Sequence, residues 1–551
     1  MRKNGLLAIV FFISGYAACF AQLKIKQSDL IVTSKGTSFI TAGKRNDNVF
    51  VIQRKKNNMA LTSFNSKSLK ISNQNLFKQK HCKGVSACID NDYDYHSTRF
   101  FPDRTIMFFQ TYDKDKSKLT FYAQDVNKKG ELKGGLVKLD AHPEKNRYRH
   151  GTYWCYPSID TTKFLVVYNT RMEDKHENEK FKFKIYDLQF DNLNNFEARL
   201  PYEDENVIVK DYYLSRDNTV YMLCKIEKER KEREKGEARD FYSVLVINPE
   251  TSELSEFKLS IPSKEIVTIQ MRLNKKGDRF SCVGLYAEIK GNRKRGKEID
   301  GVFYLTVDSK NMEILSKSFK KLDSDLSAQL EGKKKKKKKK GKKDGISKDF
   351  EIMEMIYKDD GSITVLAEYR DFYITTYTTC NSQGGCTTRY IYHYIRNNVF
   401  VINISPEGEV LSMIDIPKYQ HTTDDGGQYS SFCTYRKDDR IIIIYNDNPK
   451  NLSPEVKTIR DCKPMSNVMK SVLIAVEVKP DGSYTKQIIY DNNEKNFIPM
   501  PEDGMHIENG VYVIPAYYLK IVDIPIIGYC FTFVGALFSK QKTSLLRITL
   551  D

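Results

Sequence analysis

Tryptophan is almost absent from this 551-residue chain, which contains Trp154 and no other. Repeats marked by tryptophan–aspartate pairs, by Ser-x-Asp-x-Gly-x-Thr-Trp boxes or by paired glycines are therefore missing. Walker loops, His-Glu-x-x-His, Gly-x-Ser-x-Gly and dinucleotide-binding glycine patterns are missing as well. These absences exclude the common nucleotide-binding, zinc-protease and serine-hydrolase motifs.

Long apolar runs are also scarce, and the one at the start of the chain is short. Residues 5–20 follow the basic pair Arg2 and Lys3 and lead to small residues before Gln22. This order predicts a signal peptide over residues 1–21, because a membrane helix needs about 20 apolar residues. The remainder, 22–551, is then periplasmic, on the cell surface or secreted. Lipid attachment at Cys19 is the competing interpretation, but Tyr16 stands where a lipobox normally has an aliphatic residue.

Cysteine is modest in number, with eleven in the chain and ten after Ala21. An even number in an oxidising compartment favours disulfides, and two close pairs predict local ones: Cys380 with Cys386, and Cys82 with Cys88. Three others are interpreted as buried small hydrophobic side chains because they lie within apolar runs: Cys155, Cys224 and Cys282. The sequence leaves open whether Cys433, Cys462 and Cys530 pair across blades.

The net charge of +18 comes largely from one segment. Residues 331–345 form a lysine-rich insertion with ten lysines against two acidic residues, a net +8. Subtracting this segment and the +2 of Arg2 and Lys3 leaves +8 for the rest of the chain. No nucleic-acid partner is therefore expected. Lys333 to Lys340 could instead bind an anionic polymer or lipid surface, or the run could be a solvated insertion without a partner.

A repeated pattern of extended segments organises the chain. In the clearest copy, runs at 206–214, 219–226, 241–247 and 255–261 are separated by polar turns and one charged loop. Alternating and apolar runs of this length predict β-strands. Comparable second strands begin near Val49, Thr105, Lys163, Arg279, Ser362, Arg440 and Val511. The sequence thus holds eight copies of a four-stranded unit of about 55–80 residues.

Eight antiparallel units of four strands predict an all-β fold, a single β-propeller with eight blades. The eighth copy stops at its third strand, 543–550, and the segment 23–32 precedes the first copy. Pairing of these N- and C-terminal strands would complete the last blade and remove an exposed edge. The rival interpretations are seven blades with one divergent unit, and two separate smaller β-domains.

One face of such a propeller is expected to carry nearly all the insertions. The largest is a protruding hairpin at about 371–396, where threonine and tyrosine dominate both sides of Cys380 and Cys386. These residue types suit β-structure that is wet on both faces. Tyr377, Tyr390 and Tyr392 are the predicted contact side chains, because tyrosine is enriched in binding surfaces. The alternative is a hairpin folded down onto its own propeller.

His421, Asp424 and Asp425 form a compact polar group beside two glycines. The sequence predicts that this group enters the first strand of the seventh blade, at the mouth of the ring. A histidine with two carboxylates could perform acid–base chemistry or hold a cation. Alternatively, the aspartates cap backbone amides in a polar turn. We interpret the three as binding residues and predict no catalytic residue.

Two further groups suggest metal ions. His96 and His150 also lie near tyrosines at predicted strand starts, but these copies and that of His421 are not consecutive, so no shared metal site is predicted. Asp90, Asp92 and Asp94 alternate as in a calcium loop. The EF-hand pattern fails because it requires glycine and glutamate where this chain has Tyr95 and Phe101. A different calcium site stays open, and no other cofactor is predicted.

The stretches TTDDGG (422–427) and YNDNPKN (445–451), beside the lysine-rich insertion, resemble a group of uncharacterised secreted proteins of Bacteroidota, over about residues 340–485. The resemblance implies a cell-envelope setting; it carries no known activity and transfers no functional residues. The favoured hypothesis is a binding or scaffold propeller that holds an envelope protein or glycan on its elaborated face. The alternative is a hydrolase or lyase acting on an anionic polysaccharide at the mouth of the propeller.

Overall fold

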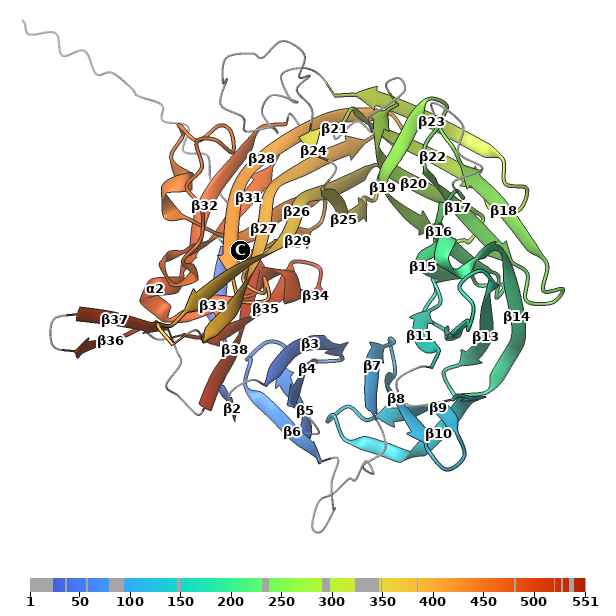
Figure 1. Cartoon of the computed structure of the whole chain (residues 1–551), viewed down its shortest axis with the longest axis horizontal. Coiled ribbons are helices and arrows are strands. Elements are labelled where there is room, and N and C mark those ends of the chain that lie inside the picture. The colour runs from blue at the N-terminus through green and yellow to red at the C-terminus, as the bar shows by residue number, and fades with distance from the viewer. Residues whose placement is uncertain are drawn as a thin grey trace, which may run out of the picture.

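The computed structural model describes residues 23–34, 37–55, 58–78, 94–145, 150–229, 237–289, 298–322, 346–347, 349–383, 385–479, 482–519, 521–526, 529–534 and 540–550. Strands dominate this part of the chain and close into a ring (Figure 1). No helix in the described ranges is long and apolar enough to cross a membrane.

The first four blades are regular four-stranded antiparallel sheets in chain order. Blade one contains β3 (Ser38–Arg45), β4 (Asn48–Lys55), β5 (Asn58–Asn65) and β6 (Ile71–Lys78). Blade two contains β7 (Asp94–Phe100), β8 (Thr105–Asp113), β9 (Lys118–Val126) and β10 (Leu132–Pro143). Blade three contains β11 (Thr152–Pro157), β12 (Lys163–Thr170), β13 (Asn178–Asp187) and β14 (Asn192–Glu203). Blade four contains β15 (Val207–Leu214), β16 (Val220–Glu227), β17 (Asp240–Ile247) and β18 (Leu254–Leu259).

Blades five to seven follow the same order with longer excursions. Blade five contains β19 (Lys264–Leu273), β20 (Arg279–Glu288), β22 (Gly301–Asp308) and β23 (Ile314–Lys321), and the short β21 (Glu298–Ile299) pairs with β24 (Ile346–Ser347). Blade six contains β25 (Phe350–Tyr357), β26 (Ile363–Cys380), β27 (Cys386–Ile404) and β28 (Val410–Thr423). Blade seven contains β29 (Cys433–Lys437), β30 (Arg440–Asp447), β31 (Val472–Val478) and β32 (Tyr484–Asp491).

The eighth blade joins both ends of the chain, as the sequence predicted. Its order is β1–β38–β35–β33, with β2 also on β38 and β34 also on β35. These strands are β1 (Leu23–Gln27), β2 (Ile31–Ser34), β33 (Phe497–Pro499), β34 (Met505–Glu508), β35 (Val511–Tyr518) and β38 (Lys540–Leu550). Leu23 lies opposite Leu550 in the register of β1 and β38. The eight-bladed prediction is therefore confirmed, and the seven-bladed and two-domain rivals are wrong.

The remaining elements are short. The hairpin β36 (Ile521–Ile526) and β37 (Tyr529–Val534) extends from the eighth blade. The helical turns are η1 (Asp204–Asn206), η3 (Pro449–Leu452), η4 (Val468–Lys470), η5 (Pro501–Asp503) and α2 (Asn492–Lys495).

The second and third strands of each blade form the core because their side chains are apolar on both faces. In β30, for example, every residue from Ile441 to Asp447 is buried. Each core cluster spans two neighbouring blades: one joins Phe183 of blade three to Met222 of blade four, and the next joins Tyr242 to Phe303. Blade-to-blade burial of apolar side chains is thus what holds the ring together.

Candidate functional site

The sixth blade carries a long ribbon beyond its sheet. β25 pairs with β26 only as far as Tyr369, whereas β26 and β27 stay paired up to Cys380 and Cys386. These two cysteines form the predicted disulfide, with a Cα–Cα distance of 4.0 Å. We call residues 371–396 the arm. Figure 1 shows that it leaves the ring at the sixth blade.

The root of the arm is braced by a third strand. β28 pairs with β27 as far as Thr423 opposite His393. Asp424 then continues the contact: its backbone N–H donates to the Tyr392 carbonyl at 3.0 Å, and its Oδ1 accepts from the Tyr392 N–H at 2.9 Å. Beyond this root, residues 372–380 are exposed on both faces. The arm therefore projects into solvent and is not folded down onto the propeller.

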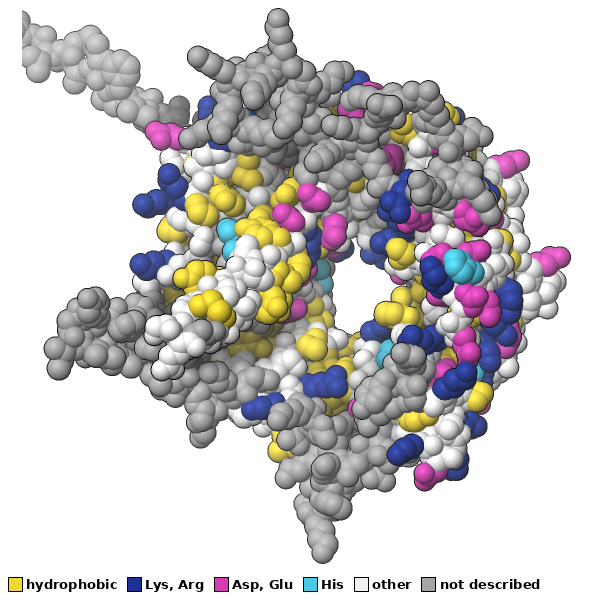
Figure 2. Space-filling model, in the orientation of Figure 1, with side chains coloured by type: hydrophobic (Ala, Val, Ile, Leu, Met, Phe, Trp, Pro, Cys, Tyr) yellow, Lys and Arg dark blue, Asp and Glu magenta, His cyan; other side chains and the backbone are white. Residues whose placement is uncertain are grey.

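One face of the arm is unusually apolar for a surface. The register places Phe372 opposite Tyr394, Ile374 opposite Tyr392 and Thr376 opposite Tyr390, so these side chains share one face. Phe372, Ile374, Tyr390 and Tyr392 are between 41% and 56% exposed. We call Phe372, Ile374, Tyr390, Tyr392 and Tyr394 the aromatic face; Figure 2 shows hydrophobic side chains along the arm. Tyr377, 64% exposed, lies on the opposite face.

His421 lies elsewhere than the sequence predicted. It belongs to the last residues of β28, in the sixth blade, and does not enter the first strand of the seventh. The reason is that β28 runs past its own blade to pair with the arm, so His421 lies opposite Ile395. Its Nε2 is 3.0 Å from Nδ1 of His393, which stacks on Tyr373. Burial, and then the charge of His393, lower the pKa of His421.

The two aspartates beside His421 are used in separate contacts. Asp424 bonds Tyr392 as described, and its Oδ2 lies 3.5 Å from Nη2 of Arg389. Asp425 accepts from the Thr422 hydroxyl at 2.9 Å and from the Gly427 N–H at 2.8 Å. Burial raises the pKa of Asp425. The structure thus has a polar turn that caps backbone amides and anchors the arm, with no convergence of His421, Asp424 and Asp425 on one point.

Several predicted features lie outside the described residues: Cys82, Cys88, Asp90, Asp92, the run Lys333 to Lys340, the segment 1–21 and the side chain of Cys530. Among the described cysteines, Cys155, Cys224 and Cys282 are buried free thiols, as predicted. Cys433 and Cys462 are also free and buried. Burial raises the pKa of the Cys155 thiol to about 12, so these thiols are packing groups and not nucleophiles.

Of the three histidines considered for a shared metal site, His96 and His150 lie against backbone carbonyls. Nε2 of His96 is 2.9 Å from the Tyr153 carbonyl, and Nδ1 of His150 is 2.5 Å from the carbonyl of its neighbour Gly151. Among the described residues, a different trio offers three ligand atoms within 4.8 Å of one another: His176, Glu203 and Glu205. Lys175 already pairs with Glu205 at 2.5 Å, so a cation would have to displace this lysine.

The innermost strands share a feature that the sequence analysis missed. The first strands of the blades border the central opening (Figure 1), and five of them contain one extra residue relative to the second strand. The extra residues are Ala42, His96, Lys210, Val267 and Met353. Such bulges re-aim a side chain and are common beside binding sites. An alignment of the eight copies on their second strands could have shown this insertion.

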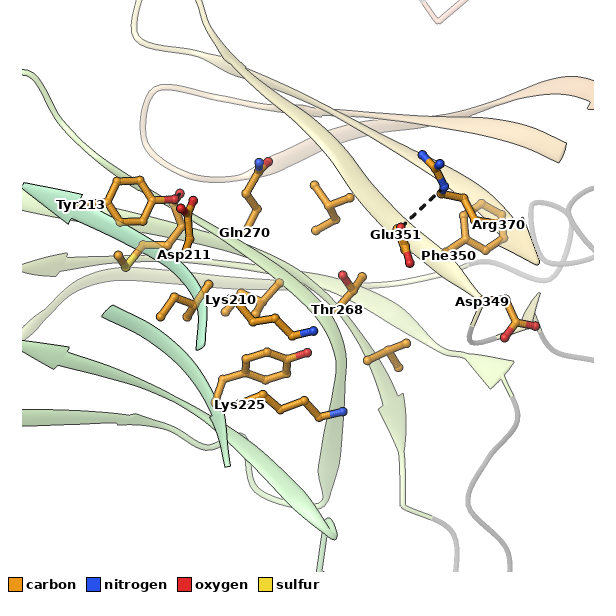
Figure 3. Close-up of a pocket in the computed structure, with 16 residues that line it drawn as sticks. Lys210, Asp211, Tyr213, Lys225, Thr268, Gln270, Asp349, Phe350, Glu351 and Arg370 are labelled. Atoms are coloured by element: carbon orange, nitrogen blue, oxygen red, sulfur yellow. Dashed lines mark hydrogen bonds and ion pairs between the residues drawn. The ribbon is translucent and has the colours of Figure 1, made fainter. Parts of the chain in front are cut away.

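A cavity of about 530 Å³ lies where three of these bulged strands adjoin, in blades four, five and six. Its lining is polar and charged (Figure 3) and includes Lys210, Lys225, Gln270, Glu351 and Arg370. The ring is open at its centre on the face seen in Figure 2, where both acidic and basic side chains surround the opening. This size is within the range of pockets that bind small ligands.

Beneath the arm, a buried ion pair joins two strands of blade six, β26 and β28. Lys418 and Glu368 are both fully buried, and Nζ of Lys418 is 2.5 Å from Oε1 of Glu368. Lys418 also donates to Gln420 at 2.9 Å, and Ser431 donates to the other Glu368 oxygen at 2.7 Å. Desolvation lowers the pKa of Lys418, and Glu368 opposes this shift. Among the described residues, Lys418, Glu368, Gln420 and Ser431 thus form a buried polar network at the root of the arm.

A second buried carboxyl makes stability depend on pH. Asn398 Nδ2 donates to both oxygens of Asp415 at 2.7 Å, and burial raises the pKa of Asp415 to about 7. Between about pH 4 and pH 7 the native state holds a proton that the unfolded chain has released, so the free energy of unfolding falls as pH rises through this window.

We expect Asp415→Asn to remove this fall, which is on the order of 4 kcal/mol because one pKa unit corresponds to about 1.36 kcal/mol. Urea unfolding at pH 4.5 and pH 8 measures the difference in the free energy of unfolding. Comparison with the parent protein removes the contribution of the titratable groups that both proteins share. Asp115→Asn, at an exposed turn, is the matched control. If the free energy of unfolding changed equally with pH in the parent and Asp415→Asn proteins, Asp415 would not be the group responsible.

Comparisons with known proteins support no specific activity. No family model matches the chain, and no curated protein matches it significantly. Among solved structures, the β-propeller domain of the Trilobed protease from Pyrococcus furiosus is 11% identical to this chain. The match covers 84% of this chain and 98% of that domain, with a TM-score of 0.35.

Two further solved structures are similar at the same level. An uncharacterized protein from Listeria monocytogenes is 8% identical, with 80% of this chain and 95% of that chain covered and a TM-score of 0.34. An acylaminoacyl peptidase from Pyrococcus horikoshii is 11% identical, with 88% of this chain and 58% of that chain covered and a TM-score of 0.34. The architecture of this chain therefore rests on its own strand topology.

Proposed function

We propose that this protein is an extracytoplasmic binding or scaffold propeller that holds an envelope protein or glycan with its arm. The observation that carries the proposal is the aromatic face, four of whose side chains are 41% to 56% exposed. Large tyrosine and phenylalanine side chains exposed together are costly in water and typical of contact surfaces. The disulfide and the β28 brace hold the two strands in place, which lowers the entropy lost on binding.

The edge of the arm supports the same proposal. Between Asp371 and Cys380, β26 pairs with β27 on one side and with no described strand on the other. Natural sheet edges are commonly protected by lysine, proline or a bulge, and this segment has neither lysine nor proline. A partner could therefore add an extended segment to β26 while its side chains contact the aromatic face.

Catalysis on an anionic polysaccharide has less support. Asp424 and Asp425 bond backbone amides and His421 contacts His393, so none of the three is directed at a common substrate position. Attachment to an anionic polymer or lipid surface through Lys333 to Lys340 stays a separate prediction. It requires binding that weakens steeply as salt rises.

The test is affinity capture from the native envelope fraction with three forms of the full chain. In the first variant, Tyr390 and Tyr392 are replaced by serine. In the matched control, Tyr377 on the opposite face is replaced by serine. We expect the parent and the control to retain the same specific protein or glycan and the aromatic-face variant to lose at least nine-tenths of it. Equal capture by all three forms, or no specific capture by the parent, would refute the arm as the binding element.

A further inference from the structure

The cavity between blades four, five and six is a second place where this protein could hold a ligand, and it is independent of the arm. It is built from inner strands β15, β19 and β25, each of which carries a bulge at this level. In β15 the bulged residue is Lys210 itself. A residue inserted at this point is displaced from the regular pleat, so its side chain is aimed differently from those of the flanking residues.

The lining contains three acidic side chains, Asp211, Asp349 and Glu351, and three basic ones, Arg370, Lys210 and Lys225, of which the two lysines lie on one side of the cavity. In Figure 3 the side chains of Lys210 and Lys225 run in the same direction, and both ammonium groups point toward the space beside Thr268. Lys225 is held by Asp240 at 2.9 Å. Lys210 is exposed and has no ion-pair partner among the residues that the structure describes. Two ammonium groups, one of them unpaired, favour an anionic group on the ligand.

Two hydrogen-bond acceptors, Gln270 and Glu351, also line the cavity. Oε1 of Gln270 is buried and has no hydrogen-bond partner within the described chain, which is costly, and this side chain must turn before the oxygen can accept from a donor in the cavity. Glu351, on the far side of the cavity in Figure 3, is 65% exposed, and its one ion-pair contact within the described part of the chain is a long one of 3.7 Å to Nε of Arg370. Hydroxyl groups are the donors that suit both acceptors, because they bring no competing charge.

We propose that this cavity binds an acidic sugar, with the anionic group against Lys210 and Lys225 and the hydroxyl groups against Gln270 and Glu351. The two lysines would equally accept the carboxylate of a uronic acid or the phosphate of a sugar phosphate. Free inorganic phosphate can pair with the lysines but lacks the ring hydroxyl groups that a sugar offers to Gln270 and Glu351. Inorganic phosphate should therefore bind more weakly than acidic sugars.

The experiment is calorimetric titration of the whole protein with trigalacturonic acid, maltotriose, glucose 6-phosphate and inorganic phosphate. We expect binding of at least one acidic sugar, at least tenfold weaker binding of inorganic phosphate, and no binding of the neutral maltotriose. Lys210→Met should weaken the acidic sugar at least tenfold. Gln270→Met should weaken the acidic sugar and leave inorganic phosphate unchanged.

Lys133→Met provides the matched control, because Lys133 is exposed on the outer strand β10, in blade two. It should change no affinity. The proposal is overturned if neither acidic sugar binds, if phosphate alone binds, if maltotriose binds as tightly as the acidic trisaccharide, or if Lys210→Met binds like the parent. Since the cavity does not include the arm, serine at Tyr390 and Tyr392 should not affect these titrations, and the two proposals can fail separately.

Discussion

Lys418→Met is expected to lower the free energy of unfolding by about 3–5 kcal/mol, the range found when one partner of a buried ion pair is removed. Glu368 would keep its charge in a fully buried position and lose the ammonium group 2.5 Å away. Arg370, with Nη1 at 3.6 Å from the other Glu368 oxygen, compensates only in part. Urea unfolding of the two proteins at pH 7.5 measures the difference.

The double variant Lys418→Met with Glu368→Met separates the loss of the pair from the cost of an unpaired charge. Replacing both partners with apolar side chains of similar length is often close to neutral, so the double variant should recover most of the lost stability. It will not recover all of it, since Ser431 and Gln420 also lose a partner. A single variant within 1 kcal/mol of the parent would show that the pair is not fully desolvated.

Deleting residues 23–34 should prevent the ring from closing. This segment supplies β1 and β2, which are paired with β38, and it buries Leu23 and Ile31. Burial of these two side chains alone is worth about 3–6 kcal/mol, and the deletion also bares the edge of β38. We expect a protein that unfolds at much lower urea concentration and aggregates.

A synthetic peptide with the sequence of residues 23–34 provides the control. Added to the truncated protein, it should occupy the vacant edge of β38 and raise the midpoint of unfolding in proportion to its concentration. A scrambled peptide of the same composition should have no effect. A truncated protein as stable as the parent would show that the terminal strand contributes little to closure.

The strands and their order could be predicted from the sequence because each blade has strongly apolar middle strands. The run 219–226 predicted β16, observed as Val220–Glu227. The arm was predictable for a different reason: threonine and tyrosine persist on both sides of Cys380 and Cys386 far beyond the length of a blade strand.

The position of His421 and the cavity could not be predicted, because both depend on contacts between distant segments. The stretch from His421 to Thr423 is polar, and nothing in its sequence shows that it continues the fourth strand of blade six; it does so because the extended β27 offers it a hydrogen-bonding edge. The bulge at Lys210 disturbs the apolar pattern of its strand too little to be recognised in the sequence of a single blade. Gln270 and Glu351 line the same cavity as Lys210 only because the ring places three consecutive blades side by side.

The pairing of β1 with β38 also fixes when this protein can finish folding. A strand that emerges first finds its neighbour only after about 500 further residues have followed, because Leu23 pairs with Leu550. Contacts so distant along the chain form slowly. Before β1 pairs with β38, the seven other blades form an open arc with an unpaired strand edge at each end. The newly made chain will therefore pass through a stage that is prone to associate with other copies, and chaperones that cover strand edges should increase its yield.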